Sequence, residues 1–414
     1  MSKLLLFVTT RLPWPQNSGR KVSLYHYCRG LAEHYGYEIT LFTFPEWDQA
    51  REVGEKPPFI GDVQFSAPIS RARKCAGLLG AALTGAPLQS ALYYSGKNRR
   101  LLGELVKDLS PDVVVFDMIR LAPYMKDLSG HARVILDLDD LLSRRYERQL
   151  AAPTTDTGIA GHYGGGMPRV LERLLCHGTL GRLILKSEQK RLARAELAYS
   201  RQADGVILVS DLEAAHLNQS LGEEKAVAVP LGVEVETFAA DTPKHPRTFG
   251  FVGNMQVAAN VASLDHIVKN ILPRLNAPYT FEVAGPVPDE VRERFAGTPS
   301  LTFLGEVPSL APVLSRWQFT LCPIAFGSGL KTKILEAMAA GLPVLTNTVG
   351  AESIGAQNGQ EIFVLDREKD LADTANRLLD DPAACEVIGQ AAAHFVRTRF
   401  SWDRAFEAFS KLHL

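Results

Sequence analysis

The stretch PIAFGSGLKTKILEAMAAGLPVLTNTVGAESIG, residues 323–355, decides how the rest of the sequence is interpreted. It predicts the end of a strand, a glycine-bearing turn, a helix, a tight turn and another strand. Gly327 and Gly329 allow a ligand to approach the backbone closely. We expect the helix to begin near Leu330 and to direct its free N–H groups and the positive end of its dipole at the turn. A diphosphate fits such a site.

The helix after this turn has one polar face. Lys333, Glu336 and Ala337 share this face on a helical wheel, whereas the larger apolar side chains fall on the opposite half. The polar face offers a cation for phosphate, a carboxylate that accepts hydrogen bonds from ribose hydroxyls, and small side chains that leave room. A solvated helix pair beside a plain glycine turn is the alternative interpretation.

Short apolar runs alternate with helical patterns on both sides of this stretch, which predicts an α/β fold with parallel sheets. The runs expected as strands are 3–10, 37–44, 112–117, 133–139 and 205–210, and then 248–254, 280–285, 301–307, 319–324, 343–348 and 361–365. The two sets predict two Rossmann-like, doubly wound domains facing across a cleft, with ligands beyond the carboxyl ends of the strands. We place the domains at 1–230 and 231–399, with a last helix of about 400–414 that packs back on the first.

Composition narrows the class of protein. The chain of 414 residues has 45 basic and 46 acidic side chains, a balance that argues against a nucleic-acid binder. Its five scattered cysteines are expected to be buried in a reducing compartment. No apolar stretch is long enough to span a bilayer, and the first ten residues form a strand-like pattern and not a signal peptide. We therefore expect a cytoplasmic protein.

The donor-side motif resembles that of the retaining GT-B glycosyltransferases of family four, the group 1 type, in which a glycine turn and a basic residue precede LEAMA-G-PV. The matching residues are Gly327, Gly329, Lys333, Glu336, Ala337, Met338, Ala339, Gly341, Pro343 and Val344. PLGVEVETF (230–238) resembles the hinge segment of the family, and FSWDRAFEAF (400–409) resembles its terminal helix. The resemblance implies a two-domain enzyme that uses a nucleotide-diphosphate sugar as donor.

Two departures from the family pattern concern the donor. Ser328 stands where many members have a glutamate that contacts the donor sugar, and FVGNMQVAANVASL (251–264) lacks the usual arginine and lysine. A subset with FVG-M-N is similar, and there the diphosphate charge falls to Lys331 or Lys333, of which Lys333 is favoured. The donor contacts that the resemblance implies are Gly253, Asn254, Gly327, Ser328, Gly329, Leu330, Lys333 and Glu336. Asn254 is equally well explained as a turn residue.

The first strand is followed by TTRLPWPQNSGRKVSLYHY (9–27), which resembles the amino-terminal glycine loop of the family. That loop lies near the donor phosphates, and Ser18, Gly19 and Arg20 are the candidates here. Strand-end loops of such sheets face the cleft, which favours this function. A plain loop rich in proline and glycine is the alternative.

Asp117 ends the strand 112–117, where similar enzymes place a histidine or acidic group near the reacting centre. We predict it as a catalytic residue that hydrogen-bonds the transferred sugar or orients the acceptor hydroxyl, together with Lys333 and Glu336 on the donor side. A second acidic cluster, 137–140, raises the question of a metal. No His or Cys lies at ligand spacing, and such GT-B enzymes generally need no metal, so we expect no metal and no cofactor besides the donor.

Two basic and apolar stretches, 70–83 and 169–186, have the composition of helices that lie on an anionic membrane. Ordinary amphipathic packing is the alternative. Together with the resemblance, they suggest a hexosyltransferase that retains the anomeric configuration and builds cell-surface polysaccharide or glycoconjugate on a glycan, lipid-linked or small-molecule acceptor. It would work in the cytoplasm, in peripheral contact with the inner face of the membrane. The alternatives are a sugar-nucleotide epimerase or hydrolase of the same fold, and a non-catalytic carbohydrate-binding protein.

Overall fold

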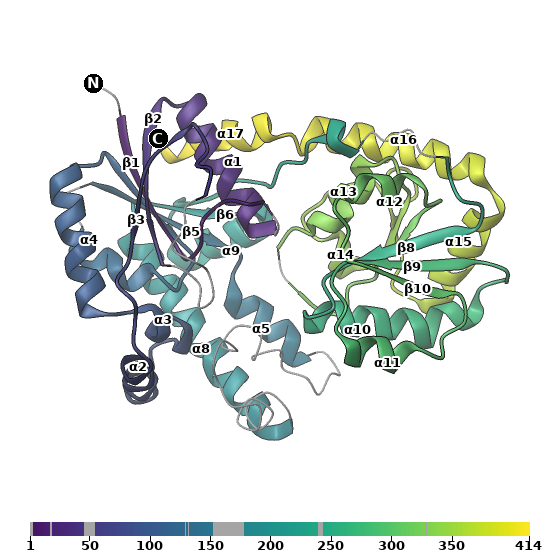
Figure 1. The fold of residues 1–414 in the computed structure, drawn as a ribbon, viewed down its shortest axis with the longest axis horizontal. Coiled ribbons are helices and arrows are strands. Elements are labelled where there is room, and N and C mark those ends of the chain that lie inside the picture. Colours follow the sequence, from purple (N-terminus) through teal and green to yellow (C-terminus); the bar gives the residue numbers. More distant parts are fainter. Residues whose placement is uncertain are drawn as a thin grey trace.

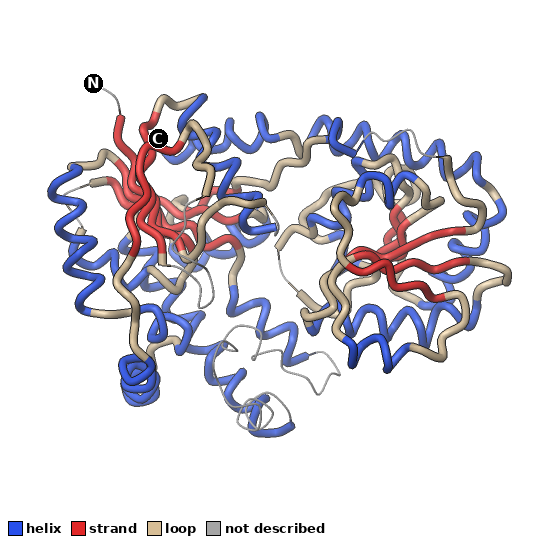
Figure 2. The backbone as a smooth tube through the Cα atoms, viewed as in Figure 1, coloured by secondary structure: helices blue, strands red, loops and turns tan. Residues whose placement is uncertain are grey.

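The computed structural model describes residues 3–16, 19–44, 54–128, 130, 132–151, 178–238, 243–327 and 329–414. Two separate parallel sheets form the centres of two domains that lie side by side (Figure 1). Helices flank both sheets (Figure 2), which gives the doubly wound α/β architecture that the sequence predicts.

The first domain has a seven-stranded sheet in the order β3-β2-β1-β4-β5-β6-β7, and all of its pairs are parallel. Its strands are β1 (Lys3–Thr9), β2 (Tyr37–Thr43), β3 (Ile60–Phe65), β4 (Val113–Asp117), β5 (Arg133–Asp139), β6 (Gly205–Leu208) and β7 (Ala226–Ala228). Its helices are α1 (Gly19–Glu33), α2 (Arg71–Thr84), α3 (Leu88–Tyr93), α4 (Gly96–Leu109), η1 (Ala122–Asp127), α5 (Leu142–Ala151), α8 (Gly178–Gln202) and α9 (Asp211–Leu221).

The second domain has a six-stranded parallel sheet in the order β10-β9-β8-β11-β12-β13. Its strands are β8 (Thr248–Val252), β9 (Thr280–Ala284), β10 (Leu301–Gly305), β11 (Thr320–Leu321), β12 (Val344–Thr346) and β13 (Phe363–Val364). The helices and helical turns after β7 are η2 (Val235–Phe238), α10 (Ala258–His266), η3 (Ile267–Ile271), η4 (Leu272–Arg274), α11 (Asp289–Phe295), α12 (Ala311–Ser315), α13 (Thr332–Ala339), α14 (Thr348–Ala351), α15 (Glu368–Asp380), α16 (Pro382–Arg399), α17 (Trp402–Phe409) and η5 (Ser410–Leu412).

The central strands form because their apolar runs are covered on both faces. Residues 5–8 of β1 are almost completely buried, and their side chains divide between two clusters on opposite faces of the first sheet. A third cluster fills the second domain, and it includes Val209 from the first domain. β3 is absent from the sequence prediction because this edge strand is half exposed and has no continuous apolar run.

The chain crosses between the domains twice, and the two crossings lie side by side. The N–H of Val233, in the first crossing, donates to the carbonyl of Phe400, in the second, at 2.7 Å. After α16 the chain returns to the first domain, where α17 packs on α1 and the Tyr35 hydroxyl donates to the carbonyl of Phe406 at 2.6 Å. Both chain ends therefore lie at the same domain (Figure 1).

The cysteines differ partly from expectation. Cys28, Cys322 and Cys385 are buried free thiols, whereas Cys75 is exposed on α2, so the expectation of burial was wrong at this position. Only a small part of α2 is covered by the rest of the domain, because the helix buries little beyond Ala81. Cys176 lies outside the described residues.

Candidate functional site

The turn after β11 is held by side chains from two neighbouring segments. The Asn347 amide accepts from the N–H of Ile324 at 3.1 Å and donates to the Ile324 carbonyl at 2.9 Å. The hydroxyl of Ser263, on α10, accepts from the N–H of Ala325 at 3.1 Å. These bonds fix the backbone that leads into the glycine turn predicted as the donor site.

Both glycines of the turn have backbone conformations that favour glycine, with φ of +154° at Gly327 and +64° at Gly329. A Cβ atom built on Gly329 would lie 3.4 Å from the Cβ of Asp140 and 3.4 Å from the Cγ2 of Val209, both in the first domain. The turn therefore lies directly against the other domain. Ser328, predicted to contact the donor sugar, lies outside the described residues.

Helix α13 follows the turn but begins at Thr332, two residues later than expected. Leu330 is buried before the helix begins, with Lys331 at the N-cap position. The prediction that Ala337 shares the open face was wrong, because Ala337 is completely buried in the core of the second domain. This short helix packs over most of its circumference, and only a narrow face stays open.

Lys333 lies on this open face, and its surroundings join it to the end of β8. Its Nζ donates to Oδ1 of Asn260 at 2.5 Å and lies 4.6 Å from the centre of the Phe251 ring. Burial lowers the pKa of Lys333. Asn260 also donates to the carbonyl of Asn254 at 2.8 Å, and a Cβ on Gly253 would come within 3.0 Å of Asn260. The structure thus brings Gly253, Asn254 and Lys333 together through Asn260, which the sequence did not single out.

The side chain of Asn254 has the turn role that was its alternative. Its Oδ1 accepts from the N–H of Gln256 at 2.8 Å, which closes a local turn before α10. Its Oδ1 is therefore occupied by the turn and is not free to accept from a ligand.

Glu336 is partly exposed one turn after Lys333 on α13. Burial raises the pKa of Glu336, and the charge of Lys333 counteracts this shift. In the described part of the chain no hydrogen bond engages its carboxylate. The carboxylate is therefore available to accept hydrogen bonds from a ligand.

Gly19 connects the first domain to this site. It is the first residue of α1, and a Cβ atom built on it would lie 3.9 Å from Oγ1 of Thr332, the first residue of α13. The amino-terminal glycine loop therefore ends at the N-terminus of α13. Ser18 lies outside the described residues.

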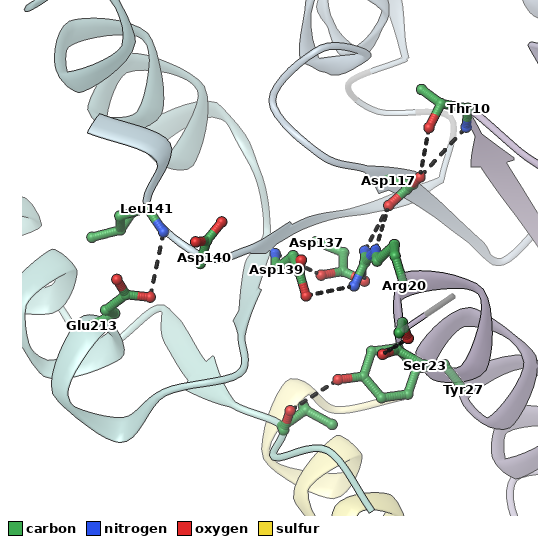
Figure 3. A network of polar contacts seen from close by, with 12 residues as sticks. Thr10, Arg20, Ser23, Tyr27, Asp117, Asp137, Asp139, Asp140, Leu141 and Glu213 are labelled. Atoms are coloured by element: carbon green, nitrogen blue, oxygen red, sulfur yellow. Dashed lines mark hydrogen bonds and ion pairs between the residues drawn. The ribbon is translucent and has the colours of Figure 1, made fainter. Parts of the chain in front are cut away.

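Arg20, the next residue, points into a buried acidic cluster (Figure 3). Its Nη2 lies 2.6 Å from Oδ1 of Asp117 and 2.7 Å from Oδ2 of Asp137, and its Nη1 lies 3.1 Å from Oδ1 of Asp139. The expectation that Arg20 serves the donor phosphates was wrong, because three carboxylates at the ends of β4 and β5 attract its charge inward.

Asp117 is completely buried at the centre of this network. One carboxylate oxygen binds Arg20, and the other accepts from the hydroxyl of Thr10 at 3.2 Å and from its N–H at 3.4 Å. Burial opposes ionisation of Asp117, yet the Arg20 charge and these bonds keep its pKa below the ordinary value. For Asp137, burial outweighs Arg20 and raises the pKa to about 7. One arginine does not neutralise three carboxylates.

A further arginine, absent from the sequence prediction, links the two domains. Arg148 on α5 donates from Nη1 to the carbonyl of Gly327 at 2.8 Å and from Nη2 to Glu352 at 2.6 Å. Nearby, the hydroxyls of Ser210 and Ser353 are 2.6 Å apart. No spacing signal predicts these pairs, because each joins residues more than 140 positions apart.

Two features are absent from the described residues. No group of three or more His, Cys, Asp or Glu side chains there is placed to hold a metal ion. Likewise, none of the helices in the described ranges combines the length and the apolar character needed to cross a membrane.

Residues 246–381 match the family described as Glycosyl transferases group 1. This segment contains the second sheet, the glycine turn and α13, so the similarity to this family lies in the C-terminal half of the chain. No curated protein sequence matches the chain.

Solved structures are similar over nearly the whole length. Sucrose-phosphate synthase from Thermosynechococcus elongatus has a TM-score of 0.67 at 16% identity, with 99% of this chain and 98% of that one covered. TarM from S. aureus has a TM-score of 0.68 at 11% identity, with 100% and 99% covered. HepE from Anabaena, solved in complex with UDP, has a TM-score of 0.62 at 14% identity, with 99% and 98% covered. These likenesses show that both domains adopt the GT-B fold.

Proposed function

We propose that this chain, a glycosyltransferase by its fold and its matched domain, transfers a hexose from a nucleotide-diphosphate sugar to an acceptor hydroxyl with retention of configuration. The observation that carries the proposal is the proximity of Gly19 to the N-terminus of α13. A Cβ atom built on Gly19 would lie 3.9 Å from Oγ1 of Thr332. This proximity brings the two glycine loops, one from each domain, to the same helix end.

In this proposal the donor diphosphate binds at the glycine turn. The first N–H groups of α13 have no partner within the helix, and its dipole favours an anion there. Lys333 adds a positive charge, and Glu336 accepts hydrogen bonds from the ribose hydroxyls. These groups stabilise the leaving nucleotide diphosphate, so that bond cleavage is assisted electrostatically. Contact of Ser328 with the donor sugar stays a prediction.

HepE has been solved with UDP and with UDP-glucose, and TarM with UDP, which makes UDP the first nucleotide to test here. The proposed reaction needs neither a metal nor another cofactor, since Lys333 and the helix end supply the positive charge. A role for Asp117 beside the acceptor also stays a prediction. Its carboxylate is bound to Arg20, so we propose that it acts by holding Arg20 and the start of α1 in position.

We further propose that the enzyme works at the inner face of the membrane, on a lipid-linked or glycan acceptor of cell-surface polysaccharide synthesis. Helix α2 supports this, because Leu79 and Leu83 are 69% and 89% exposed on the same helix as the exposed Arg71 and Arg73. Of the stretch 169–186, only residues from 178 on are described. Sedimentation with vesicles that contain phosphatidylglycerol should fall for the double variant Leu79→Gln, Leu83→Gln, and equal sedimentation would refute the membrane role.

The transferase proposal is tested by product analysis with each candidate nucleotide sugar. Sugar should appear on an acceptor in the wild type, and the Glu336→Ala variant should lose transfer while keeping its thermal unfolding transition. Free sugar without any acceptor product would indicate a hydrolase, and an epimerised donor would indicate an epimerase. Full transfer by the Glu336→Ala variant would refute the assignment of Glu336 to the donor site.

A further inference from the structure

A buried arginine at the acceptor side of the first domain is not part of the network around Arg20. Arg120 lies three residues after the end of β4, and 8% of its surface is exposed. Its Nε is buried without a hydrogen-bond partner. Within the described ranges the guanidinium forms no ion pair either, and it lies over the ring of Tyr93 at 5.9 Å.

This arrangement costs stability. A buried N–H donor that has no hydrogen-bond partner is unfavourable, because it has lost its contact with water. The contact with the Tyr93 ring returns only part of this cost. A buried donor without a partner in the protein is explained if a ligand supplies the acceptor. A bound anion would be such a ligand.

A second buried group next to it lacks the opposite kind of partner. Gln89 donates from its side chain to the hydroxyl of Tyr146 at 2.6 Å, but its carbonyl oxygen Oε1 is buried without a donor. Arg120 acts electrostatically on the same tyrosine. The structure therefore holds an unfilled donor in the segment after β4 and an unfilled acceptor on α3.

The two groups belong to one rigid unit. The Ser90 hydroxyl on α3 donates to the carbonyl of Ile119, the residue before Arg120, at 3.1 Å. The Tyr124 hydroxyl donates to the carbonyl of Tyr93 at 2.7 Å, which ties the end of α3 to η1. The Tyr93 ring is partly exposed, so the unit reaches the surface there.

We propose that Arg120, Gln89 and Tyr93 form an acceptor subsite that binds an anionic group, a carboxylate or a phosphate, carried by the acceptor sugar. The planar fork of arginine matches either anion with paired hydrogen bonds. The Gln89 carbonyl accepts from a sugar hydroxyl, and the exposed part of the Tyr93 ring packs against an apolar sugar face. The subsite follows β4, at the edge of the sheet where parallel α/β domains bind ligands. The proposal rests on the transferase function for its biological meaning, but the binding of the anion does not.

Binding is measured first without any donor, by ligand-observed NMR with three probes: methyl glucoside, glucuronate and glucose 6-phosphate. The wild type should bind at least one anionic probe at least tenfold more tightly than methyl glucoside. Comparison of glucuronate with glucose 6-phosphate tells whether the anion is a carboxylate or a phosphate. Arg120→Met should lose the preference for the anionic probe, and Arg120→Lys should keep part of it. Arg201→Ala, which removes an exposed arginine of the same domain, is the matched control and should bind as the wild type does.

Thermal unfolding distinguishes a binding role from a structural one. Arg120→Met removes an unpaired buried charge and should leave the melting temperature unchanged or raise it, whereas a structural arginine would lower it. Equal binding of neutral and anionic probes by the wild type, or unchanged binding in Arg120→Met, would overturn the proposal. Anion binding that depends on Arg120 in a protein that binds no nucleotide would leave the subsite standing and refute the transferase function instead.

Discussion

Arg148 donates to the carbonyl oxygen of Gly327 at 2.8 Å, so an arginine of the first domain holds the glycine turn of the second. The same guanidinium pairs with Glu352, which follows α14 in the second domain. Within the turn, Lys331 donates to the carbonyl of Gly329 at 2.5 Å. Because the N–H of a trans peptide points opposite to its carbonyl, the N–H of Leu330 is directed away from the Lys331 ammonium. The two cations thus orient the turn whose N–H groups are proposed to bind the diphosphate.

Arg148→Ala should loosen this turn. We expect the KM for the nucleotide sugar to rise by about tenfold, the order expected when a hydrogen bond to a charged group is lost, with a smaller effect on kcat. Amide hydrogen exchange in peptides that cover 322–336 should become faster. Exchange measured by mass spectrometry reports on the turn whether or not the enzyme is active.

The control for this variant is Arg144→Ala, which removes the same charge from the same helix. Its exchange in 322–336 and its donor KM should match those of the wild type. If both variants behave alike, net charge and not the contact with Gly327 determines the effect.

Glu336 is predicted to recognise ribose hydroxyls, and this can be tested on the ligand side. The wild type should bind the matching nucleoside diphosphate at least tenfold more tightly than its 2′,3′-dideoxy analogue, because hydrogen bonds to a carboxylate contribute about 1.5–3 kcal/mol. Glu336→Ala should bind the two ligands with similar affinity. If that variant still discriminates between them, another residue holds the ribose.

Gly389 on α16 packs against the turn that ends α13. A Cβ atom there would lie 1.9 Å from the carbonyl oxygen of Gly341, a backbone atom with no room to move. Gly389→Ala should therefore lower the free energy of unfolding by about 1–3 kcal/mol in urea titrations. Gly103→Ala on α4 is the control, since no atom lies within 4 Å of its added Cβ, and it should be neutral or stabilising by up to about 1 kcal/mol. Equal stability of the two variants would contradict the packing.

Glu196 on α8 should make stability depend on pH. Burial raises the pKa of Glu196 from 4.5 to about 7, against hydrogen bonds from Ser143. The folded state thus binds this proton more tightly than the unfolded state, and stability falls as the pH rises from about 4.5 to about 7. Glu196→Gln should flatten the pH dependence of unfolding in this interval by up to about 1.4 kcal/mol per pH unit. Parallel curves for the variant and the wild type would show that Glu196 does not titrate there.

The sequence predicted the strands and the glycine turn before α13 for a physical reason. Buried parallel strands need continuous apolar runs, and glycines mark a turn whose backbone has positive φ, so both signals are local. The sequence did not predict β3, because an exposed edge strand lacks such a run. Helix α13 begins later than expected, because the ends of helices have the weakest sequence signals.

The site residues that the sequence did not predict correctly depend on contacts between residues far apart in the chain. Arg20 looked like a loop residue facing the donor, yet it is drawn to carboxylates 97 to 119 positions away. Asn260, Arg148 and Arg120 have no local motif, and only the assembled sheet edge and the domain interface reveal their roles.

The central claim, that the turn before α13 binds a nucleoside diphosphate, is tested most directly by calorimetric titration of the protein with UDP, GDP, dTDP and ADP, with and without Mg²⁺. The account predicts that one of them binds without the metal and that Lys333→Ala weakens this binding at least tenfold, whereas replacement of the exposed Lys269 leaves it unchanged. Absence of binding to all four, or equal binding by Lys333→Ala and the wild type, would contradict it.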